Sequence, residues 1–407
     1  MKKTVNENIK VCFIYLLKLI ASVLNGKKAP FDKNADWNIM LELSKKHSVQ
    51  NLLYYAVASF SEEEKAEIDS KVIGELEKNH SLAVVKESNQ QYYADEIIKD
   101  FEKNHIKNMP LKGFFLKNSY PSPDMRAMSD IDILFDISDY QQIKKLLTNN
   151  HHMTIALEYD KTFSFNLPPF FHLEMHSSLV DKTIGNNYLE KVFDRAKKRN
   201  GFSYSYKMTD EDAYIYMVYH AAGHCVGGGI GIKMIMDFYV FVKEYGDKLD
   251  WEYVNARLKE TSLFDFEQCI KRLSFDWFSL QSDVKELDIV GEYVLLSGTY
   301  GRFDVSMLSK SLQDQRSSKE KNKKSNGITF FLKTVFPPYS KMIMIYPIVK
   351  KLPFLYPFSW VFRWFHRLIQ DKNKVINKAR LSLKYVDEAD KSYYQTIMEE
   401  MGLDKSE

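Results

Sequence analysis

Two carboxylates two residues apart are the side chains best suited to chemistry in this chain. Asp130 and Asp132 stand in an otherwise apolar run, downstream of the pair Lys112-Gly113. Residues i and i+2 of a strand point to the same side, so both carboxylates would share one face. Neighbouring carboxylates repel each other without a cation, and Mg²⁺ is usually held by one or two carboxylates plus substrate phosphates. The pair therefore predicts a magnesium site, with a simple strand cap as the alternative.

A second segment with strand periodicity offers a third carboxylate. Within residues 171–176, His172, Glu174 and His176 alternate with apolar residues, which is typical of a strand with one polar face. If this strand lies beside the aspartate pair, the three carboxylates could hold two Mg²⁺ ions, or Mn²⁺ in their place, roughly 3.5–4 Å apart. Glu174 would also be placed to deprotonate an acceptor hydroxyl. Metal-assisted nucleotidyl transfer is the simplest chemistry of such a cluster, and a polar strand face exposed to water is the alternative.

A histidine pair further along the chain suggests another wall of the same site. His220 and His224 are four residues apart, a spacing that could bind zinc on one helix face. The zinc peptidase pattern requires a glutamate directly after the first histidine, and Ala221 stands there. We expect both histidines and Lys233 to line the substrate cleft, with the glycine-rich segment 227–231 letting the backbone approach a ligand. A histidine pair packed in the core, and an ion pair between Lys233 and the residue four positions on, are the alternatives.

These motifs together resemble the uncharacterised nucleotidyltransferase family, within the DNA polymerase β-type nucleotidyltransferase superfamily. The Asp130-Ile131-Asp132 triplet with its upstream glycine is the most specific part of the resemblance. The matching residues are Leu111-Lys112-Gly113, Tyr120-Pro121, Arg126, Asp130-Ile131-Asp132, Glu174-Met175-His176, the segment 219–224, Ile232-Lys233, Asp237, Phe336-Pro337, Tyr346-Pro347 and the segment 357–360.

The resemblance implies an α+β fold, in which a small mixed β-sheet is flanked by helices and the N- and C-terminal regions are largely helical. By position, Asp130, Asp132 and Glu174 match the superfamily's metal ligands. The implied reaction is Mg²⁺-dependent transfer of a nucleoside monophosphate from a nucleoside triphosphate such as ATP, with release of pyrophosphate. The acceptor would be a small molecule, a peptide or a protein. Two alternatives are an inactive member that binds a nucleotide or a partner, and a membrane-docked accessory factor of a biosynthetic pathway.

The same resemblance places the triphosphate over the first motif. Gly113 matches the glycine of the turn that holds the nucleotide in this superfamily. A serine normally follows that glycine, whereas Phe114 follows it here. Lys112 could replace the missing hydroxyl as a phosphate contact, and Arg126 would be an additional one.

Composition and patterning bound the remaining possibilities. The chain has 407 residues, is 45% apolar and carries a formal charge of +3, so we expect several ordered domains and do not expect nucleic acid as the main partner. Its three cysteines are odd in number and far apart, which favours a reduced compartment. Helices are expected near 8–25, 37–60, 62–79, 83–104, 139–149, 212–219 and 233–245. The expected regions are an N-terminal helical region 1–105, a nucleotidyltransferase core 106–182, a helical substrate-side domain 183–310, a flexible basic linker 311–327 and an aromatic and basic C-terminal arm 328–407.

Both ends of the chain raise the question of membrane contact. The apolar stretch 11–24 is interrupted by Lys18 and is too short to span a bilayer. Its apolar positions recur at helical spacing and predict an amphipathic helix with Val11, Tyr15, Leu16, Leu19 and Val23 on one face. Between residues 328 and 369, aromatic side chains, prolines and basic residues are interspersed, a composition that suits a membrane interface. Packing on the body and a dimer contact are the alternatives for this arm. We expect a cytoplasmic protein with peripheral membrane contact through the arm.

Overall fold

A computed structural model describes most of the chain. The described residues are 6–159, 161–179, 187–281, 283–299, 301, 336–339, 342–343, 346, 348–365 and 388–403. The chain divides into two compact units, Thr4–Gly301 with Ile397–Glu407 and Met1–Lys3 with Arg302–Thr396. The finer boundaries expected from the sequence stay predictions, and the predicted linker 311–327 lies outside the described residues.

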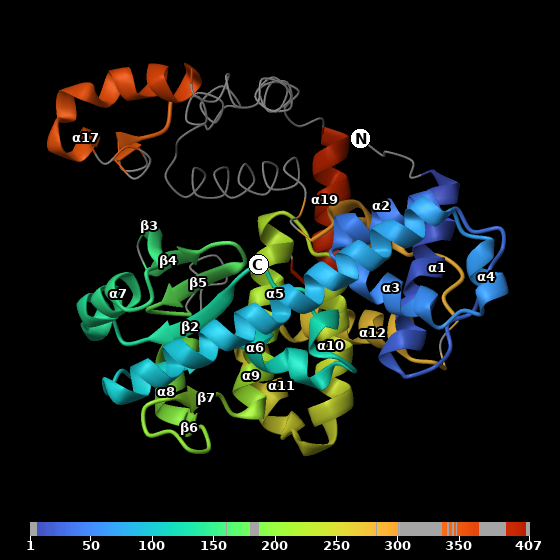
Figure 1. Ribbon diagram of the computed structural model, residues 1–407, viewed down its shortest axis with the longest axis horizontal. Helices are drawn as coiled ribbons and strands as arrows, with labels where there is room; N and C mark the ends of the chain where they lie inside the picture. The colour runs from blue at the N-terminus through green and yellow to red at the C-terminus, as the bar shows by residue number, and fades with distance from the viewer. Residues whose placement is uncertain are drawn as a thin grey trace. The chain divides into compact units, whose positions relative to one another are not determined.

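The larger unit contains a five-stranded mixed sheet (Figure 1). Its strands are β1 (Asn108–Pro110), β2 (Ile131–Phe135), β3 (Thr154–Tyr159), β4 (Thr162–Leu167) and β5 (Phe171–His176). Their order is β1-β2-β5-β4-β3, and β2 runs parallel to β5 while the other neighbouring pairs are antiparallel. A two-stranded ribbon of β6 (Lys197–Lys198) and β7 (Tyr206–Lys207) forms a separate sheet that contacts the β1 edge through Asn108 and Ser205. The predicted α+β class, a small mixed sheet with flanking helices, is confirmed.

Alternation along β2 and β5 gives the sheet one apolar face and one polar face. Ile131, Ile133 and Phe135 of β2 are at most 1% exposed. They pack in one core with apolar residues of β5 and of the helices α5 (Ser70–Lys103) and α7 (Tyr140–Asn149). Asp132 and Glu174 fall on the opposite face because successive strand residues point to opposite sides. Burial of the apolar face thus fixes which way the carboxylates point.

Five helices precede the sheet. They are α1 (Glu7–Leu24), α2 (Trp37–His47), α3 (Gln50–Ala58), α4 (Glu62–Ala66) and α5 (Ser70–Lys103). The predicted helix 37–60 is interrupted at Ser48, whose φ of 55° is left-handed. The predicted break near residue 80 is wrong: α5 begins at its Asp69 cap and continues, since no glycine or proline stands near that point. Figure 1 shows α5 extending from the sheet to the N-terminal helices.

The amphipathic helix expected at the N-terminus is confirmed as α1, and most of its predicted apolar face is buried. Leu16, Leu19 and Val23 are at most 8% exposed. Val11 is 58% exposed, so its predicted place on the buried face is wrong. None of the helices in the described ranges is long and apolar enough to cross a bilayer.

The other helices of the larger unit follow β1 in the chain. They are the short α6 (Lys112–Leu116), α7 (Tyr140–Asn149), the short α8 (Val192–Arg195), α9 (Asp210–Gly227), α10 (Ile232–Tyr245), α11 (Trp251–Glu260), α12 (Phe264–Phe278) and α13 (Ile289–Ser297). The helices predicted at 139–149, 212–219 and 233–245 are thus confirmed, and α9 is longer than expected. It begins at Thr209, whose side chain accepts from the backbone N–H of Asp212, a typical N-terminal cap. Short 3₁₀ helices are found at Lys117–Ser119, Pro123–Met125, Ile137–Asp139, Tyr188–Lys191, Gly246–Lys248 and Pro353–Leu355.

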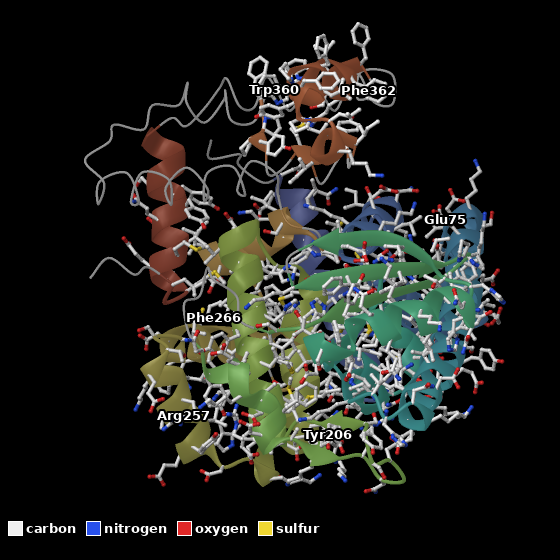
Figure 2. All side chains as sticks on the ribbon, turned by 90° about the vertical axis from the view of Figure 1, so that its left-hand side faces the viewer. Glu75, Tyr206, Arg257, Phe266, Trp360 and Phe362 are labelled. Atoms are coloured by element: carbon white, nitrogen blue, oxygen red, sulfur yellow. The ribbon has the colours of Figure 1, made fainter. Side chains whose placement is uncertain are left out.

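The second unit exposes large aromatic side chains. It contains α17 (Ile348–Lys351), and α19 (Glu388–Glu400) begins within it. Figure 2 labels Trp360 and Phe362 in a helical stretch that follows α17. Phe362 is 61% exposed, and Phe354 and Phe358 are each 67% exposed. Large aromatic side chains on the outside of a unit are unusual enough to suggest a partner surface.

Candidate functional site

The polar face of β2 and β5 carries the predicted carboxylates. Asp132 lies opposite Glu174 in the parallel pairing of the two strands. His176 of β5 joins them, because its Nε2 is 2.9 Å from Oδ1 of Asp132. One ligand atom from each of these three side chains lies within 4.8 Å of the other two. The fold therefore brings together residues from two separate motifs in an arrangement that could hold a metal ion.

Asp130 lies close to this cluster without being part of it. Its side chain lines the same cavity, and its Oδ1 accepts a hydrogen bond of 2.9 Å from Oγ of Ser129. Among the described residues, the compact set of ligand atoms comprises Asp132, Glu174 and His176. The predicted role of Asp130 as a metal ligand stays a prediction.

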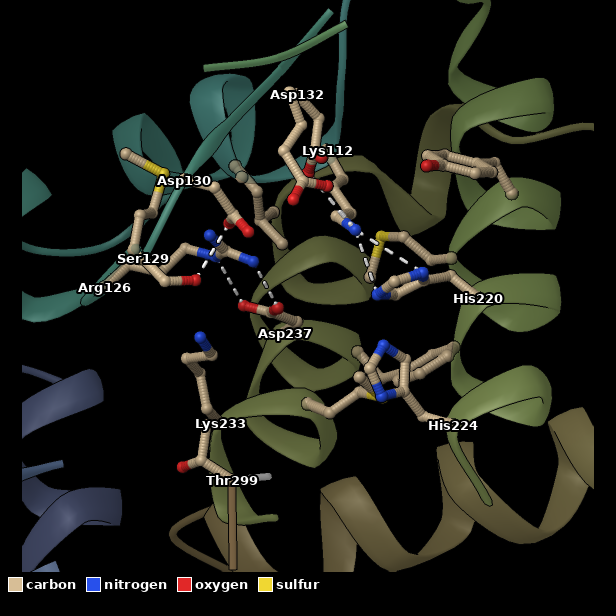
Figure 3. A pocket seen from close by; sticks show the side chains of 18 of the residues that line it. Lys112, Arg126, Ser129, Asp130, Asp132, His220, His224, Lys233, Asp237 and Thr299 are labelled. Atoms are coloured by element: carbon tan, nitrogen blue, oxygen red, sulfur yellow. Dashed lines mark hydrogen bonds and ion pairs between the residues drawn. The ribbon is translucent and has the colours of Figure 1, made fainter. Parts of the chain in front are cut away.

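A lysine from α6 faces the carboxylates. Nζ of Lys112 is 3.3 Å from Oδ2 of Asp132 and 3.0 Å from Nε2 of His220, and Figure 3 draws both interactions. Burial disfavours the ammonium ion, but Tyr216 and the carboxylates outweigh burial and raise the pKa of Lys112. Lys112 therefore keeps its charge at the centre of the site.

The charge of Asp132 is also secured. Burial alone would raise the pKa of its carboxyl, but the charge of Lys112 and the hydrogen bond from His176 lower it well below its ordinary value. An ionised carboxylate beside a cavity is the form that coordinates a hard cation. Asp132 is thus ready to bind a metal without first losing a proton.

Helix α9 contributes one stripe of side chains to the site. Tyr216, His220 and His224 follow one another at intervals of four residues and line the cavity, as expected for one helix face. The two imidazole rings lie 4.4 Å apart between centroids (Figure 3). Burial and the charge of Lys112 lower the pKa of His220 well below its usual value. Its neutral ring can therefore accept the hydrogen bond from that ammonium group.

A buried ion pair forms the floor of the site. Nε and Nη2 of Arg126 donate to the two carboxylate oxygens of Asp237 at 2.8 and 2.7 Å, and the hydroxyl of Tyr120 donates to the same carboxylate at 2.6 Å. Arg126 is only 6% exposed. A Cβ on Gly113 would overlap Nη1 of Arg126, so the glycine allows the guanidinium to pack directly against α6. The predicted contact of Arg126 with phosphate stays a prediction, since two of its three nitrogens already bind Asp237.

Helix α10 adds a second lysine. Lys233 lines the cavity, and its Nζ donates to the carbonyl of Ala127 at 3.2 Å. Burial and the charge of Arg126 lower the pKa of Lys233 to about 8. Asp237, four residues further along α10, pairs with Arg126, so the simple helix ion pair considered for Lys233 is wrong.

These elements enclose a cavity of about 400 Å³. Of the candidate residues, His172 lies outside the cavity lining given by the described residues, with its Nε2 3.5 Å from Oε1 of Glu174. The lining residues are Lys112, Gly113, Leu116, Arg126, Met128, Ser129, Asp130, Asp132, Glu174, His176, Tyr216, Met217, His220, His224, Lys233, Met234, Asp237, Phe238 and Thr299.

The glycine-rich segment 227–231 was expected to let the backbone approach a ligand. At Gly231 the close neighbour is instead another part of the protein backbone. A Cβ on Gly231 would meet the backbone of Gly298 at 2.8 Å, so the neighbour that this glycine accommodates is protein backbone. The turn that it contacts carries Thr299 into the cavity lining. No local pattern marks Thr299, whereas Tyr216 could have been found from its four-residue spacing to His220.

The mixed sheet with paired carboxylates, a lysine and a cavity is the arrangement expected of a nucleotidyltransferase. The chain belongs to the uncharacterised nucleotidyltransferase family, which matches residues 33–279. Every cavity residue except Thr299 lies within that range. The C-terminal segments that also resembled the family lie outside it. Among curated proteins and solved structures, none matches the chain.

Proposed function

We propose that this protein is a divalent-metal-dependent nucleotidyltransferase that moves a nucleoside monophosphate from a nucleoside triphosphate to an acceptor and releases pyrophosphate. The observation that supports this most strongly is the register of Asp132 opposite Glu174 on two parallel strands. Both side chains line one cavity together with Lys112. A pair of carboxylates and a cation at one cavity wall is the chemistry that phosphoryl transfer requires.

The donor set fits a divalent ion. Asp132 and Glu174, with Asp130 in the same cavity, offer carboxylate oxygens of the kind that Mg²⁺ and Mn²⁺ prefer. When bound, such ions neutralise phosphate charge and support both the attacking and the leaving oxygen. These three carboxylates are the residues that would hold one ion or two.

Two lysines would hold the anionic substrate. Lys112 and Lys233 come from different elements and both line the cavity, so their charges converge on one space. We propose that both lysines contact the polyphosphate. Gly113, which has no side chain, would leave space for the polyphosphate beside Lys112. Arg126 would act mainly by holding Asp237 and the glycine in place.

The reaction follows from these positions. An acceptor oxygen forms a bond to the α-phosphorus, the bond from that phosphorus to the bridging oxygen of the β-phosphate breaks, and pyrophosphate leaves with the electron pair. Glu174, 29% exposed at the cavity, would take the acceptor's proton and later release it to water. Charge stabilisation and positioning would supply most of the rate enhancement.

Label transfer from α-³²P-labelled nucleoside triphosphates to components of a cell extract tests this function, because the acceptor need not be known beforehand. We expect the wild-type protein with Mg²⁺ or Mn²⁺ to label a product, and Asp132→Asn to label it at a rate lower by well over roughly 100-fold. Asp136→Asn is the matched control, because Asp136 is an exposed carboxylate at the other end of β2. Binding of a triphosphate without any label transfer would contradict the proposal and favour an inactive nucleotide-binding member.

We also propose peripheral membrane contact through the second unit. Phe354, Phe358, Phe362 and Phe365 are each more than 60% exposed, and three of their spacings are three or four residues, which groups them on one side of a helix. Phe354 itself lies in the 3₁₀ helix Pro353–Leu355, so the shared helix side belongs to Phe358, Phe362 and Phe365. Exposed aromatic side chains of this kind suit the headgroup region of a bilayer. Replacing the four phenylalanines with serine should abolish sedimentation of the full chain with phosphatidylserine-containing vesicles. Unchanged sedimentation of this variant would exclude the proposal.

A further inference from the structure

We propose that His176 is a nitrogen ligand of the metal centre, and that the resulting Asp132–Glu174–His176 set prefers Mn²⁺ to Mg²⁺. The inference rests on the proposed function for the presence of a catalytic metal. Metal binding itself, however, can be measured without nucleotide and without turnover. The two proposals can therefore fail separately.

The position of one ring nitrogen carries the inference. Nε2 of His176 is 2.9 Å from Oδ1 of Asp132 and 3.8 Å from Oε2 of Glu174. It therefore faces both carboxylates at once. Since the three ligand atoms lie within 4.8 Å of one another, a single ion between them would contact two oxygens and one nitrogen.

The other ring nitrogen lies beside a hydroxyl that can accept its N–H when Nε2 ligates an ion in place of donating to Asp132. Nδ1 of His176 is 3.4 Å from Oγ1 of Thr162, which lies directly opposite His176 on the neighbouring strand β4. Metal-binding histidines commonly use their second nitrogen in an outer hydrogen bond that fixes the ring. The pairing of β4 with β5 thus orients Nε2 towards the carboxylates.

Glu174 has a similar support. Its Oε1 is 3.5 Å from Nε2 of His172, and Nδ1 of His172 contacts Oδ1 of Asn166. Asn166 lies opposite His172 on β4. The two histidines of the strand therefore have different positions: His176 faces the ligand atoms, whereas His172 stands behind Glu174.

The mixed donor set decides the class of ion. Mg²⁺ takes oxygen ligands in near-ideal octahedral geometry and keeps several waters. Imidazole nitrogen suits first-row transition ions, and Mn²⁺ accepts carboxylates as readily as Mg²⁺ does. A site with one imidazole and two carboxylates should accordingly bind Mn²⁺ more tightly than Mg²⁺.

A competing role for His176 is purely structural, as a donor that only positions Asp132. The two roles differ in whether a ring nitrogen is bonded directly to the metal ion. A ligating nitrogen couples magnetically to bound Mn²⁺, whereas a hydrogen-bonding imidazole that never touches the ion gives no directly bonded nitrogen coupling. Electron spin echo spectroscopy of the wild-type protein with Mn²⁺ alone therefore separates them without any variant.

We expect directly bonded nitrogen coupling in the wild-type protein with Mn²⁺, and a Kd for Mn²⁺ at least roughly tenfold lower than that for Mg²⁺ by calorimetry. His176→Gln should remove the coupling and raise the Kd for Mn²⁺ by more than the roughly 10–100-fold that loss of an outer-shell partner costs. His172→Gln is the matched control from the same strand face and should keep the coupling. Circular dichroism should show that both variants are folded.

Three results would overturn the inference: no Mn²⁺ binding, bound Mn²⁺ without nitrogen coupling in the wild-type protein, or coupling that persists in His176→Gln. Nitrogen coupling in a protein that transfers no label would support the inference while contradicting the proposed function. Label transfer by a protein whose bound Mn²⁺ shows no nitrogen coupling would support the proposed function and contradict the inference about His176.

Discussion

Two ionic clusters within one cavity differ in how completely their charges are satisfied. In the floor cluster, Arg126 and Asp237 form a two-point pair, each about 10% exposed or less, and the hydroxyl of Tyr120 occupies the same carboxylate. In the wall cluster, Asp132 and Glu174 share their surroundings with Lys112 and His176, but Glu174 keeps 29% of its side chain exposed. The floor cluster has little capacity left for a ligand, whereas the wall cluster has oxygens and a nitrogen available.

The difference teaches that a charged residue beside a cavity is not necessarily a substrate contact. Arg126 lines the cavity and was expected to contact phosphate, yet two of its nitrogens bind the carboxylate of Asp237. Breaking a buried pair leaves an uncompensated charge in the interior. We therefore expect changes to the floor cluster to act on stability, and changes to the wall cluster to act on metal binding and reaction rate.

The largest expected effect on stability comes from removing one partner of the floor cluster. Asp237→Ala should lower the free energy of unfolding by about 3–5 kcal/mol, because Arg126 is left buried and unpaired. Urea denaturation measures this loss. Glu96→Ala, which breaks the exposed ion pair with Lys99 in α5, is the control and should cost at most about 1 kcal/mol. Equal small effects of both substitutions would abolish the distinction between the clusters.

The second prediction concerns the dependence of stability on pH. The pKa of Lys233 is lowered to about 8 in the folded protein by burial and by Arg126, from an ordinary value of 10.5. Between these pH values the unfolded chain binds more protons at this side chain, so stability should rise with pH. The free energy of unfolding of the wild-type protein, relative to that of Lys233→Met, should rise by on the order of 3 kcal/mol between pH 8 and pH 10.5. A constant difference between the two proteins would contradict the lowered pKa.

A smaller effect is expected at the glycine between the clusters. Gly113→Ala places a Cβ against the guanidinium of Arg126 and should cost about 1–3 kcal/mol, as overpacking usually does. Gly74→Ala in α5 is the matched control, because nothing lies within 4 Å of a Cβ there, and it should be neutral or stabilising by up to about 1 kcal/mol. If Gly113→Ala leaves the free energy of unfolding unchanged, the side chain of Arg126 can move away from Gly113. Arg126 would then again be a candidate for contact with phosphate.

Much of the framework could be predicted from the sequence because its signals are local. Alternation in the segments 131–135 and 171–176 depends on neighbouring residues only, so both strands and their polar faces could be expected. The resemblance to the family then predicted the mixed sheet. Helix ends were harder: α2 ends at Ser48, whose backbone is left-handed, and the signal for this end in the sequence is only the basic run Lys45-Lys46-His47 in the last turn.

The site could be predicted only in part, because its pairings are not local. The register that sets Asp132 opposite Glu174 joins two strands that are separated in the chain by helix α7 and the β3–β4 hairpin. The commitment of Arg126 to Asp237 joins residues 111 positions apart. Sequence spacing could identify these side chains as candidates, but it could not show which of them form ion pairs with one another.

The most direct test of the account compares single and double variants of the wall cluster in the label-transfer assay. If Asp132 and Glu174 serve one centre, Asp132→Asn and Glu174→Gln should each reduce the rate by well over roughly 100-fold, more than the loss of a supporting residue costs. Residues that act as a unit are strongly non-additive, so the double variant should be about as slow as the slower single variant. A double variant whose reduction equals the product of the two single reductions would show independent roles and contradict a shared centre.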